Sequence, residues 1–218
     1  MANGATAAEA SATQVADKLP RLRLAGLHSR LAGPFDLAVD AGECVAITGA
    51  SGSGKSLLLR MIADLDPSTG EVSLDGRDRQ TFPPPAWRRQ VVYNAADSGW
   101  WSESVAEHFS TTTMDFARTM VPRLGLVSDL LAGQVLRLST GERQRLALIR
   151  ALACAPKVLL TDEPTGALDA DTTALVETVL RERLAEGVAI ILVTHSPAQA
   201  ARLGHQHFRM LDRHLVAP

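Results

Sequence analysis

The sequence predicts an α/β fold in which helices flank a mostly parallel β-sheet. Short apolar segments alternate with helical segments after residue 138, and a glycine-rich turn at residues 49–56 joins an apolar segment to a helical one. Hydrophobic residues make up 46% of the chain and charged residues 21%, as in ordinary globular proteins. The length of 218 residues fits one domain with an attached subdomain.

The first quarter of the chain predicts a tail, then strands, then a strand–loop–helix unit. Residues 1–20 are rich in alanine and lack the basic start and apolar stretch of a secretory signal, so we expect a flexible tail before a folded domain over residues 21–218. Alternating segments within residues 21–39 are typical of strands with one polar face. An apolar run predicts a buried strand at residues 43–48, and leucines at helical spacing predict a helix over residues 55–65.

The middle of the chain contains strong turn signals. Asp75-Gly76 predicts a turn, and we expect the three prolines at residues 83–85 to form a stiff surface segment outside any helix or central strand. A strand is predicted at residues 90–93. Residues 97–138 have a helical pattern interrupted by proline and glycine, which predicts a small helical subdomain.

The alternation of strands and helices resumes in the last third. It predicts a strand at residues 158–161, a helix over residues 172–186 ended by Gly187, a strand at residues 188–193 and a short helix after Pro197. Strands and helices in this order form a mostly parallel sheet.

Charge and cysteine content exclude several classes of function. With 22 basic and 24 acidic side chains the net charge is −2, so the chain as a whole lacks the basic character of a nucleic-acid-binding protein, and we expect no nucleic-acid partner. The longest uncharged run, residues 187–201, is shorter than the roughly 20 apolar residues that span a bilayer. We expect Cys44 and Cys154 to be buried thiols in a reducing compartment, which indicates the cytoplasm.

A phosphate-binding loop is predicted at residues 49–56, where glycine, four further residues and Gly-Lys-Ser lie between a strand and a helix. Glycines let successive backbone N–H groups approach phosphate oxygens that a Cβ would keep away. Lys55 would reach the β- and γ-phosphates, and the Ser56 hydroxyl would be a ligand of Mg²⁺. The alternative is a flexible loop beside an incidental lysine. The candidate nucleotide-binding residues are Gly49, Ala50, Ser51, Gly52, Ser53, Gly54, Lys55 and Ser56.

Two carboxylates follow the apolar strand at residues 158–161. In open α/β sheets ligands bind outside the carboxyl ends of the strands, so Asp162 and Glu163 would emerge near the phosphates. Asp162 would hold Mg²⁺, directly or through water, and Glu163 could polarise the water that attacks the γ-phosphate. The alternative is that both are solvated residues at the end of a strand.

The third motif is Leu-Ser-Thr-Gly-Glu-Arg-Gln-Arg at residues 138–145, ahead of an apolar helix. Ser139 and Glu142 have the spacing of a capping box, which would make this segment a stable helix N-terminus without any further function. The same unpaired N–H groups could instead hold an anion, with Gly141 permitting a close approach.

Together these motifs resemble the ATP-binding subunit of ABC transporters, a group of P-loop NTPases, over about 195 residues from Leu22 onward. The resemblance is carried by GASGSGKS at residues 49–56, LSTGERQR at 138–145, LLTDEPTGALD at 159–169 and VTHS at 193–196, in the order of the family. It implies a mostly parallel sheet with an N-terminal antiparallel β subdomain and a small helical subdomain.

The resemblance also implies a site that two copies share. Two cassettes would pair head to tail as a homodimer and hold each ATP between the phosphate loop of one copy and the LSTGE segment of the other, which includes Ser139, Gly141 and Glu142. Asp169 would contact the opposite subunit, and His195 would contact the γ-phosphate and the attacking water. Lys55, Glu163 and His195 are thus the candidate catalytic residues, with Ser56 and Asp162 as ligands of Mg²⁺.

The sequence departs from the pattern of this family at two places. The glutamine that the family places near Mg²⁺ falls at Ala96, which can neither bind a metal nor orient water, and Asp97 or a rearranged loop could compensate. Residues 26–34 lack the aromatic side chain that usually stacks on adenine, and His28 is the one planar side chain there, so the preference for ATP over GTP is open.

Trp100 and Trp101 follow the altered loop, where the family receives a helix of the membrane subunit. One or both could anchor that helix, or they could pack within the helical subdomain. We expect the histidines at 205, 207 and 214 to be surface residues and not a metal site.

These observations favour an ATPase that powers a separate membrane permease and lies at the inner face of the membrane through that permease. A non-transport ABC ATPase that acts on nucleic acid is an alternative, although the coiled-coil arms and basic extensions of such proteins are not seen. A nucleotide switch with slow hydrolysis is a second alternative, which Ala96 favours.

Overall fold

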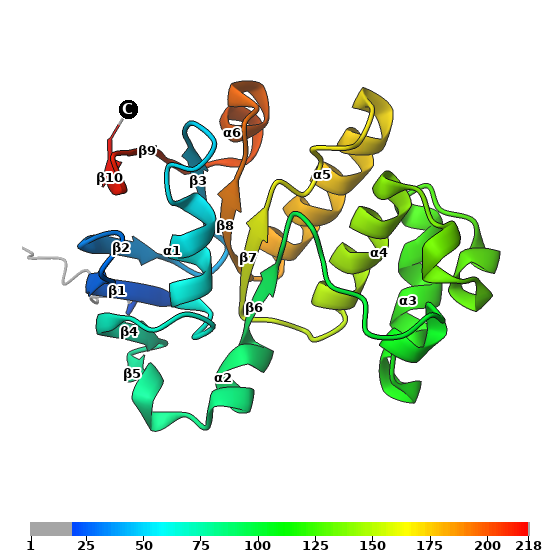
Figure 1. Cartoon of the computed structure of the whole chain (residues 1–218), viewed down its shortest axis with the longest axis horizontal. Helices are drawn as coiled ribbons and strands as arrows, with labels where there is room; N and C mark the ends of the chain where they lie inside the picture. Colours follow the sequence, from blue (N-terminus) through cyan, green and yellow to red (C-terminus); the bar gives the residue numbers. More distant parts are fainter. Residues whose placement is uncertain (1–18, 218) are drawn as a thin grey trace, which may run out of the picture.

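The computed structural model describes residues 19–217 and contains two β-sheets. Most of the expected tail at residues 1–20 therefore lies outside the described residues. Figure 1 shows the antiparallel sheet at the left, the parallel strands in the middle and the helices α3 and α4 at the right.

The central sheet has six strands in the order β10-β9-β3-β8-β7-β6. All neighbouring pairs are parallel except β10 with β9. These strands are β3 (Cys44–Thr48), β6 (Val91–Asn94), β7 (Val158–Asp162), β8 (Ala189–Val193), β9 (Gln206–Leu211) and β10 (His214–Val216). The predicted mostly parallel sheet is confirmed, and its two last strands, β9 and β10, were not foreseen.

The second sheet is antiparallel and has the order β2-β1-β4-β5. Its strands are β1 (Leu22–His28), β2 (Phe35–Val39), β4 (Thr69–Leu74) and β5 (Arg77–Asp78). Buried and exposed positions alternate along β2 and over the first residues of β1, because only one face of the sheet packs on the core. The N-terminal antiparallel subdomain that the resemblance implies is thus confirmed.

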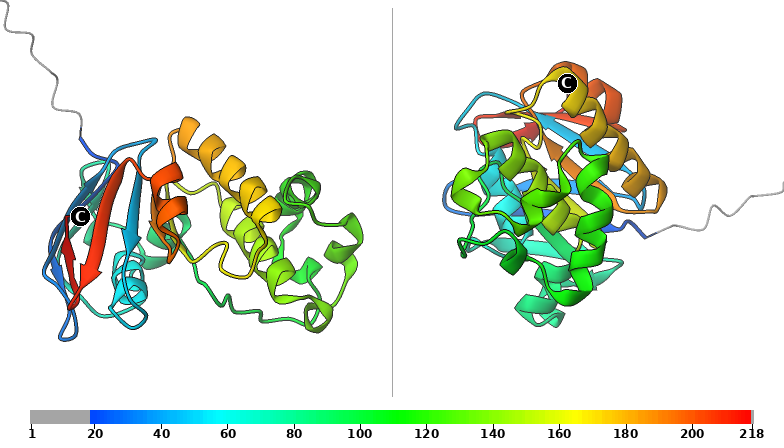
Figure 2. Two further views of the ribbon diagram at one scale, coloured as in Figure 1. Left: turned by 90° about the horizontal axis from the view of Figure 1, so that it is seen from above. Right: turned by 90° about the vertical axis from the view of Figure 1, so that its right-hand side faces the viewer.

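Two hydrophobic cores lie on the two faces of the central sheet. Val158 and Leu160 of β7 face the core that contains α1 (Lys55–Ile62) and the antiparallel sheet. Leu159 faces the other core, which α4 (Thr140–Leu152) and α5 (Ala170–Ala185) cover. Because successive strand residues point to opposite faces, the apolar run of β7 serves both cores. Figure 2 shows these layers from above.

The helical subdomain contains less α-helix than its sequence pattern indicates. Within residues 97–138 the single α-helix is α3 (Thr111–Arg123), which packs on α4. The remainder consists of loops and three 3₁₀ turns, at Ala106–His108, Ser128–Ala132 and Val135–Arg137. Another 3₁₀ turn, Arg79–Thr81, precedes α2, and α6 (Pro197–Leu203) is the short helix expected after Pro197.

Two expectations were wrong. The proline segment was expected outside any helix, yet α2 (Pro84–Gln90) begins inside it, with proline in the first turn. Proline fits there because the first N–H groups of a helix have no intrahelical partner. Cys44 is buried, and burial raises the pKa of its thiol to about 12, but Cys154 is exposed beyond the end of α4.

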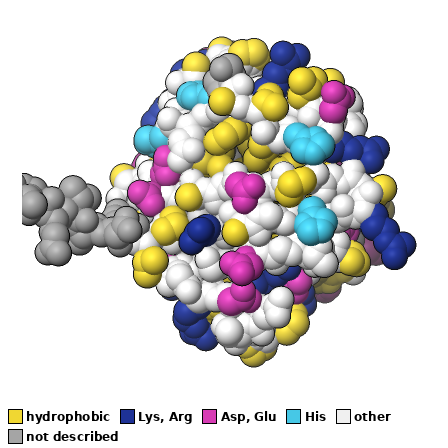
Figure 3. Space-filling model, turned by 90° about the vertical axis from the view of Figure 1, so that its left-hand side faces the viewer, with side chains coloured by type: hydrophobic (Ala, Val, Ile, Leu, Met, Phe, Trp, Pro, Cys, Tyr) yellow, Lys and Arg dark blue, Asp and Glu magenta, His cyan; other side chains and the backbone are white. Residues whose placement is uncertain are grey.

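The surface over the antiparallel sheet carries interspersed basic, acidic and hydrophobic side chains (Figure 3). Among residues 19–217, no helix combines the length and the apolar character needed to cross a bilayer.

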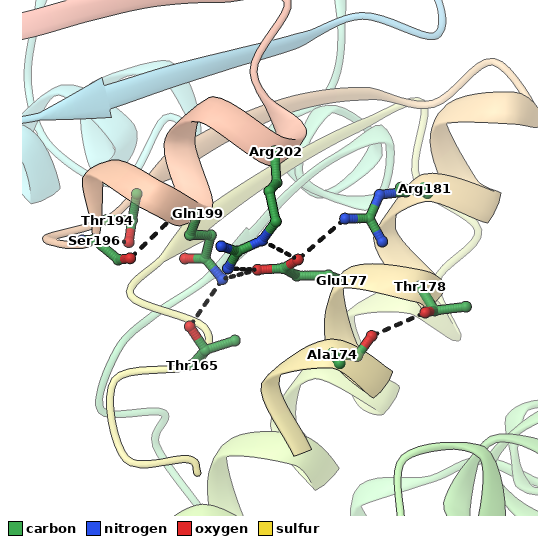
Figure 4. Close-up of polar contacts among 9 residues, drawn as sticks. All are labelled: Thr165, Ala174, Glu177, Thr178, Arg181, Thr194, Ser196, Gln199 and Arg202. Carbon is green, nitrogen blue, oxygen red and sulfur yellow. Dashed lines mark hydrogen bonds and ion pairs between the residues drawn. The ribbon is translucent and has the colours of Figure 1, made fainter. Parts of the chain in front are cut away.

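A buried carboxylate joins α5 to α6. Glu177 of α5 is 3% exposed and accepts two hydrogen bonds from the Arg202 guanidinium, at 2.6 and 2.8 Å. Arg181 contributes a third ion-pair contact at 3.1 Å, and Gln199 links this cluster to the Thr165 hydroxyl at 2.9 Å. Figure 4 shows these side chains meeting between the two helices. The cluster therefore fixes α6, and with it the segment that precedes α6, against the segment after β7.

We predict that Glu177→Gln lowers the free energy of unfolding at pH 7 by about 1–3 kcal/mol, because it removes charge-assisted hydrogen bonds. The Arg202 hydrogen bonds hold the pKa of Glu177 below its ordinary 4.5. The stabilisation is therefore complete above pH 4.5 and is lost as the pH falls through the folded pKa, so the difference between the two proteins should narrow in acid. Denaturant titrations over a pH series measure both effects.

The matched control is Glu186→Gln, which removes an ion pair with Arg183 from a side chain that is 53% exposed. We expect it to change stability by no more than about 0.5 kcal/mol. Equal stability of Glu177→Gln and the wild type at pH 7 would contradict the role assigned to this cluster.

Candidate functional site

Three parallel strands end at the same edge of the central sheet. Val193 of β8 is in register with Ile47 of β3 on one side and with Asp162 of β7 on the other. The segments that follow these strands therefore lie next to one another. They contain the phosphate loop, Glu163 and His195.

The phosphate loop is a tight turn that only glycine accommodates at its start. A Cβ on Gly49 would lie 2.7 Å from the Met210 carbonyl oxygen, which no real Cβ approaches. Gly54 has φ of 107° and precedes α1, whose first N–H groups are directed out of the helix end. The Ser53 hydroxyl is buried and has no hydrogen-bond partner within the described residues. A loop of this form suits phosphate oxygens as acceptors.

The side chain of Lys55 reaches back toward the start of this loop. Its Nζ donates to the carbonyl oxygens of Gly49 and Ala50, both at 2.8 Å. Burial lowers the pKa of Lys55, while the nearby Glu163 and Asp162 carboxylates act in the opposite direction. The lysine thus lies between the loop and the two acids, where it can neutralise added negative charge.

The backbone of Glu163 is held in an unusual conformation, with φ of 49°. Its N–H donates to the Val193 carbonyl at 2.9 Å, and its carbonyl accepts from Gln144 Nε2 at 2.5 Å. These two ties, from β8 and from α4, hold a conformation that costs a non-glycine residue free energy. They also fix the direction in which the carboxylate leaves the strand.

The side chain of Glu163 meets His195. The His195 backbone N–H donates to Oε2 at 3.1 Å, and His195 Nε2 lies 3.2 Å from Oε1. Burial raises the pKa of the Glu163 carboxyl, although the His195 N–H and the Lys55 charge oppose this. A carboxylate with increased proton affinity suits the role of a general base.

Asp162 is 4% exposed and accepts a hydrogen bond from the Tyr93 hydroxyl at 3.2 Å. Burial and the neighbouring Asp162 raise the pKa of Tyr93, so the phenol stays protonated as a donor. This contact orients the carboxylate and leaves its second oxygen for another partner. Tyr93 was not among the predicted site residues.

Most of the predicted phosphate and catalytic residues share one cleft of about 330 Å³. Those that line it are Ser51, Gly52, Gly54, Lys55, Ser56, Asp162, Glu163 and His195. Ala50 and Ser53 line the adjoining hollow beside residues 209–213. The hydroxyl of Ser56 and the carboxylate of Asp162 are the oxygen ligands that Mg²⁺ prefers, so the donor set fits this ion.

The LSTGE segment does not line that cleft. Ser139 and Glu142 form the expected capping box of α4: the Ser139 hydroxyl accepts from the Glu142 N–H at 3.2 Å, and the Glu142 carboxylate accepts from the Ser139 N–H at 2.8 Å. A Cβ on Gly141 would lie 3.1 Å from Leu168 Cδ2, and Asp169 caps α5 by accepting from the Thr172 N–H at 2.7 Å. Within one chain these residues are apart from the phosphate loop.

The structure shows where Ala96 and Asp97 lie, at the position where the sequence lacks the glutamine of the family. Ala96 lines the cleft, whereas Asp97 is exposed and does not. Compensation by Asp97 would therefore require the loop to rearrange.

Gln144, whose side chain joins α4 to Glu163, was not among the predicted site residues. It lies within the LSTGERQR motif, so that motif was the signal from which Gln144 could have been predicted.

The two tryptophans have different environments. Trp100 packs against the core that α4 and α5 cover, while Trp101 is 71% exposed. The Arg150 guanidinium lies 4.8 Å from each indole, and the ring of His108 contacts both. Core packing therefore accounts for Trp100 and leaves Trp101 available at the surface.

The C-terminal histidines do not form a metal site among the described residues. His205 Nδ1 accepts from the Cys44 N–H at 3.1 Å, and His207 Nε2 lies 3.0 Å from the Ala200 carbonyl. His214 is exposed, and its Nδ1 lies 2.8 Å from the Asp212 carbonyl.

Comparison with known proteins gives consistent matches. The sequence model of the family described as ABC transporter matches residues 33–166. The macrolide export ATP-binding/permease protein MacB of Nitrosomonas europaea is 35% identical, over 85% of this chain and 32% of MacB. The lipoprotein-releasing system ATP-binding protein LolD of Nitratidesulfovibrio vulgaris is also 35% identical, over 86% of this chain and 91% of LolD.

The fold matches solved structures as well. A dimeric structure of MJ0796, a bacterial ABC transporter cassette, superposes with a TM-score of 0.76 at 25% identity, over 89% of this chain and 96% of that one. The chain spans about a third of the length of MacB and most of the length of LolD. The family match, together with the shared cleft, establishes that this chain belongs to the ABC transporter family and is an ATP-binding cassette, an ABC-type ATPase.

Proposed function

We propose that this cassette binds Mg²⁺ and ATP at the edge of its central sheet, hydrolyses the β–γ bond and thereby powers a membrane permease. The observation that carries the proposal is the convergence of Lys55, Asp162, Glu163 and His195 on the phosphate loop in one cleft. These side chains come from three separate segments, and the parallel register of β3, β7 and β8 brings them together.

Each residue has a role that its geometry supports. The N–H groups of residues 49–56 and the Lys55 ammonium bind the β- and γ-phosphates, and Ser56 and Asp162 would hold Mg²⁺. When bound there, Mg²⁺ would supply positive charge that offsets the negative charge of the phosphates. Glu163 orients a water and accepts its proton. His195, which already contacts Glu163, would hold that water and the γ-phosphate in line.

The proposal includes a homodimer in which a second copy completes each site. Ser139, Gly141 and Glu142 lie at a capped helix N-terminus outside the cleft of their own chain. The positive end of α4 in one copy would face the γ-phosphate held by the other, with Asp169 at the contact between them. The solved MJ0796 cassette is described as dimeric, and this supports such an arrangement.

Trp101 is the proposed contact to the permease. It is exposed beside the loop that contains Ala96, so a partner helix bound there would be close to the nucleotide site. Large aromatic side chains often supply much of the binding energy of an interface. LolD and MacB are named for lipoprotein release and macrolide export, which favours export among the possible transport roles of this chain.

One observation favours a second candidate function, a nucleotide switch with slow hydrolysis. Ala96 lines the cleft, and its methyl group can neither orient water nor bind Mg²⁺. The steady-state ATPase rate, measured with and without the permease, distinguishes a motor from a switch.

We predict that Glu163→Gln retains ATP binding and lowers turnover by about 10²-fold or more, because the amide cannot accept the proton of the attacking water. Phosphate release and equilibrium ATP binding should be measured on the same preparation. The matched control, Glu71→Gln, alters an exposed acid on the antiparallel sheet and should leave both unchanged. Turnover of Glu163→Gln near the wild-type rate would refute the assignment of the base.

Lys55→Ala is expected to abolish ATP binding, because it removes the ammonium group that lies against the phosphate loop. Calorimetric titration with Mg²⁺ and ATP measures this, and circular dichroism shows whether the variant folds. Lys157→Ala is the control, since Lys157 pairs with Asp75 away from the cleft. ATP binding by Lys55→Ala with wild-type affinity would argue against this site.

Replacing Trp101 by serine should reduce the amount of cassette that copurifies with its permease from detergent-solubilised membranes, while ATP binding persists. The expected loss is most of the bound cassette, as for a residue that anchors an interface. Val216→Ser, which shortens a partly exposed apolar side chain on β10, should have no such effect. Unchanged copurification of Trp101→Ser would exclude Trp101 as the anchor.

A further inference from the structure

The cleft with the phosphate loop is also lined by two side chains from other parts of the chain, Leu31 and Arg213. Leu31 lies in the loop between β1 and β2 and is 59% exposed. Arg213 lies in the turn between β9 and β10. Neither has a part in phosphate binding or hydrolysis as described above, so their place in the cleft calls for another explanation.

Arg213 is held firmly at this position. Asp212 and Arg213 both have positive φ, 45° and 64°, and form the two-residue turn of the β9–β10 hairpin. The Arg213 carbonyl accepts from the Gly33 N–H at 3.1 Å, and its Nη1 donates to the Leu31 carbonyl at 2.8 Å. The guanidinium is therefore tied to the loop that carries Leu31, through one of its five N–H donors.

The stem of Arg213 lies over the last glycine of the phosphate loop. A Cβ built on Gly54 would be 3.5 Å from Arg213 Cγ and 3.8 Å from its Cα and Cβ, which are ordinary contact distances. Arg213 is thus a neighbour of the residue at which α1 begins. A nucleotide whose phosphates occupy the loop would extend its remaining parts within reach of this side chain.

The imidazole of His28, within residues 26–34, is directed elsewhere. His28 has its Nδ1 2.8 Å from the Gly26 carbonyl and its Nε2 2.9 Å from the Thr69 hydroxyl. It lines a different hollow, formed with Ser29, Arg30 and residues 67–69. The described residues that line the cleft include no Phe, Tyr or Trp, and the imidazole of His195 is next to Glu163. Arg213 then supplies the remaining planar group.

We propose that Arg213 and Leu31 form the platform for the base of the nucleotide, with the guanidinium plane stacked on a purine and Leu31 packed beside it. A guanidinium is planar and weakly hydrated, and it stacks well on aromatic faces. Such contacts recognise the flat face of the ring and not its hydrogen-bonding edge, so adenine and guanine are bound alike. This inference rests on the proposed function, because it requires a nucleoside triphosphate in the cleft.

The alternative role of Arg213 is that of an additional positive charge for the phosphates. The two roles differ in which ligands depend on the side chain. A stacked guanidinium matters for ATP and GTP but not for inorganic tripolyphosphate, and lysine cannot replace it. A charge contact matters for all three ligands, and lysine largely restores it.

The test is to measure the dissociation constants of ATP, GTP and inorganic tripolyphosphate, each with Mg²⁺, for the wild type, Arg213→Ala and Arg213→Lys. We expect both variants to bind ATP and GTP about 5- to 30-fold more weakly, in line with the usual strength of stacking on a base. Binding of tripolyphosphate should stay within about 2-fold of the wild type. The wild type should bind ATP and GTP within about 3-fold of each other.

Two further variants separate a direct contact from a loosened loop. Leu31→Ala keeps the carbonyl that Arg213 binds and should still weaken ATP binding by a few-fold, because it removes apolar contact with the base. Arg30→Ala removes a neighbouring positive charge that lines the other hollow and should change nothing. Equal losses for ATP and tripolyphosphate, or unchanged ATP binding by Arg213→Ala, would overturn the inference. A wild type that binds none of the three ligands would instead refute the proposed function itself.

Discussion

The site depends on the parallel register of three neighbouring strands. Because Val193 pairs with Ile47 on one side and Asp162 on the other, β3, β8 and β7 end at a common level. Each strand is buried on both faces, so a shift by one residue would move apolar side chains between the two cores and is strongly disfavoured. The packing of the cores therefore sets the position of the phosphate loop, Glu163 and His195, although none of these is part of either core.

The same edge of the sheet brings one basic and two acidic side chains close together. Lys55 faces Asp162 and Glu163, and burial shifts the pKa of Lys55 downward and that of Glu163 upward. Hydrogen bonds from the Glu163 backbone to the Val193 carbonyl and to the Gln144 side-chain amide keep Glu163 in a left-handed conformation that it would not adopt alone. Since Gln144 belongs to α4, the helix that begins at the LSTGE segment is mechanically joined to the proposed base. If α4 moved on contact with a second copy, Gln144 would shift the backbone of Glu163.

Much of this arrangement could be predicted from the sequence. The phosphate loop has its own local signature, and the apolar runs of β3, β7 and β8 are long enough to identify buried strands. The motifs do not reveal contacts between residues that are distant in the sequence: Tyr93 with Asp162, Arg213 with Leu31, and Gln144, although it lies in a motif, with Glu163. The strands β9 and β10 contain polar as well as apolar residues, because they are the two outermost strands at one edge of the central sheet and are partly exposed. Their sequences therefore lack the continuous apolar run that identifies a buried strand. The start of α2 was missed because proline is compatible with the first turn of a helix, and the exposure of Cys154 depends on where α4 ends.

In the proposed complex, one edge of the sheet binds the triphosphate and a second copy closes over it. The most direct measurement is an experimental structure of the chain with Mg²⁺ and a non-hydrolysable ATP analogue. We expect the phosphates to contact the N–H groups of residues 49–56 and Lys55, and residues 138–145 of another copy to cover the γ-phosphate. Nucleotide bound away from the cleft, or a γ-phosphate covered by residues 138–145 of the same copy, would contradict it.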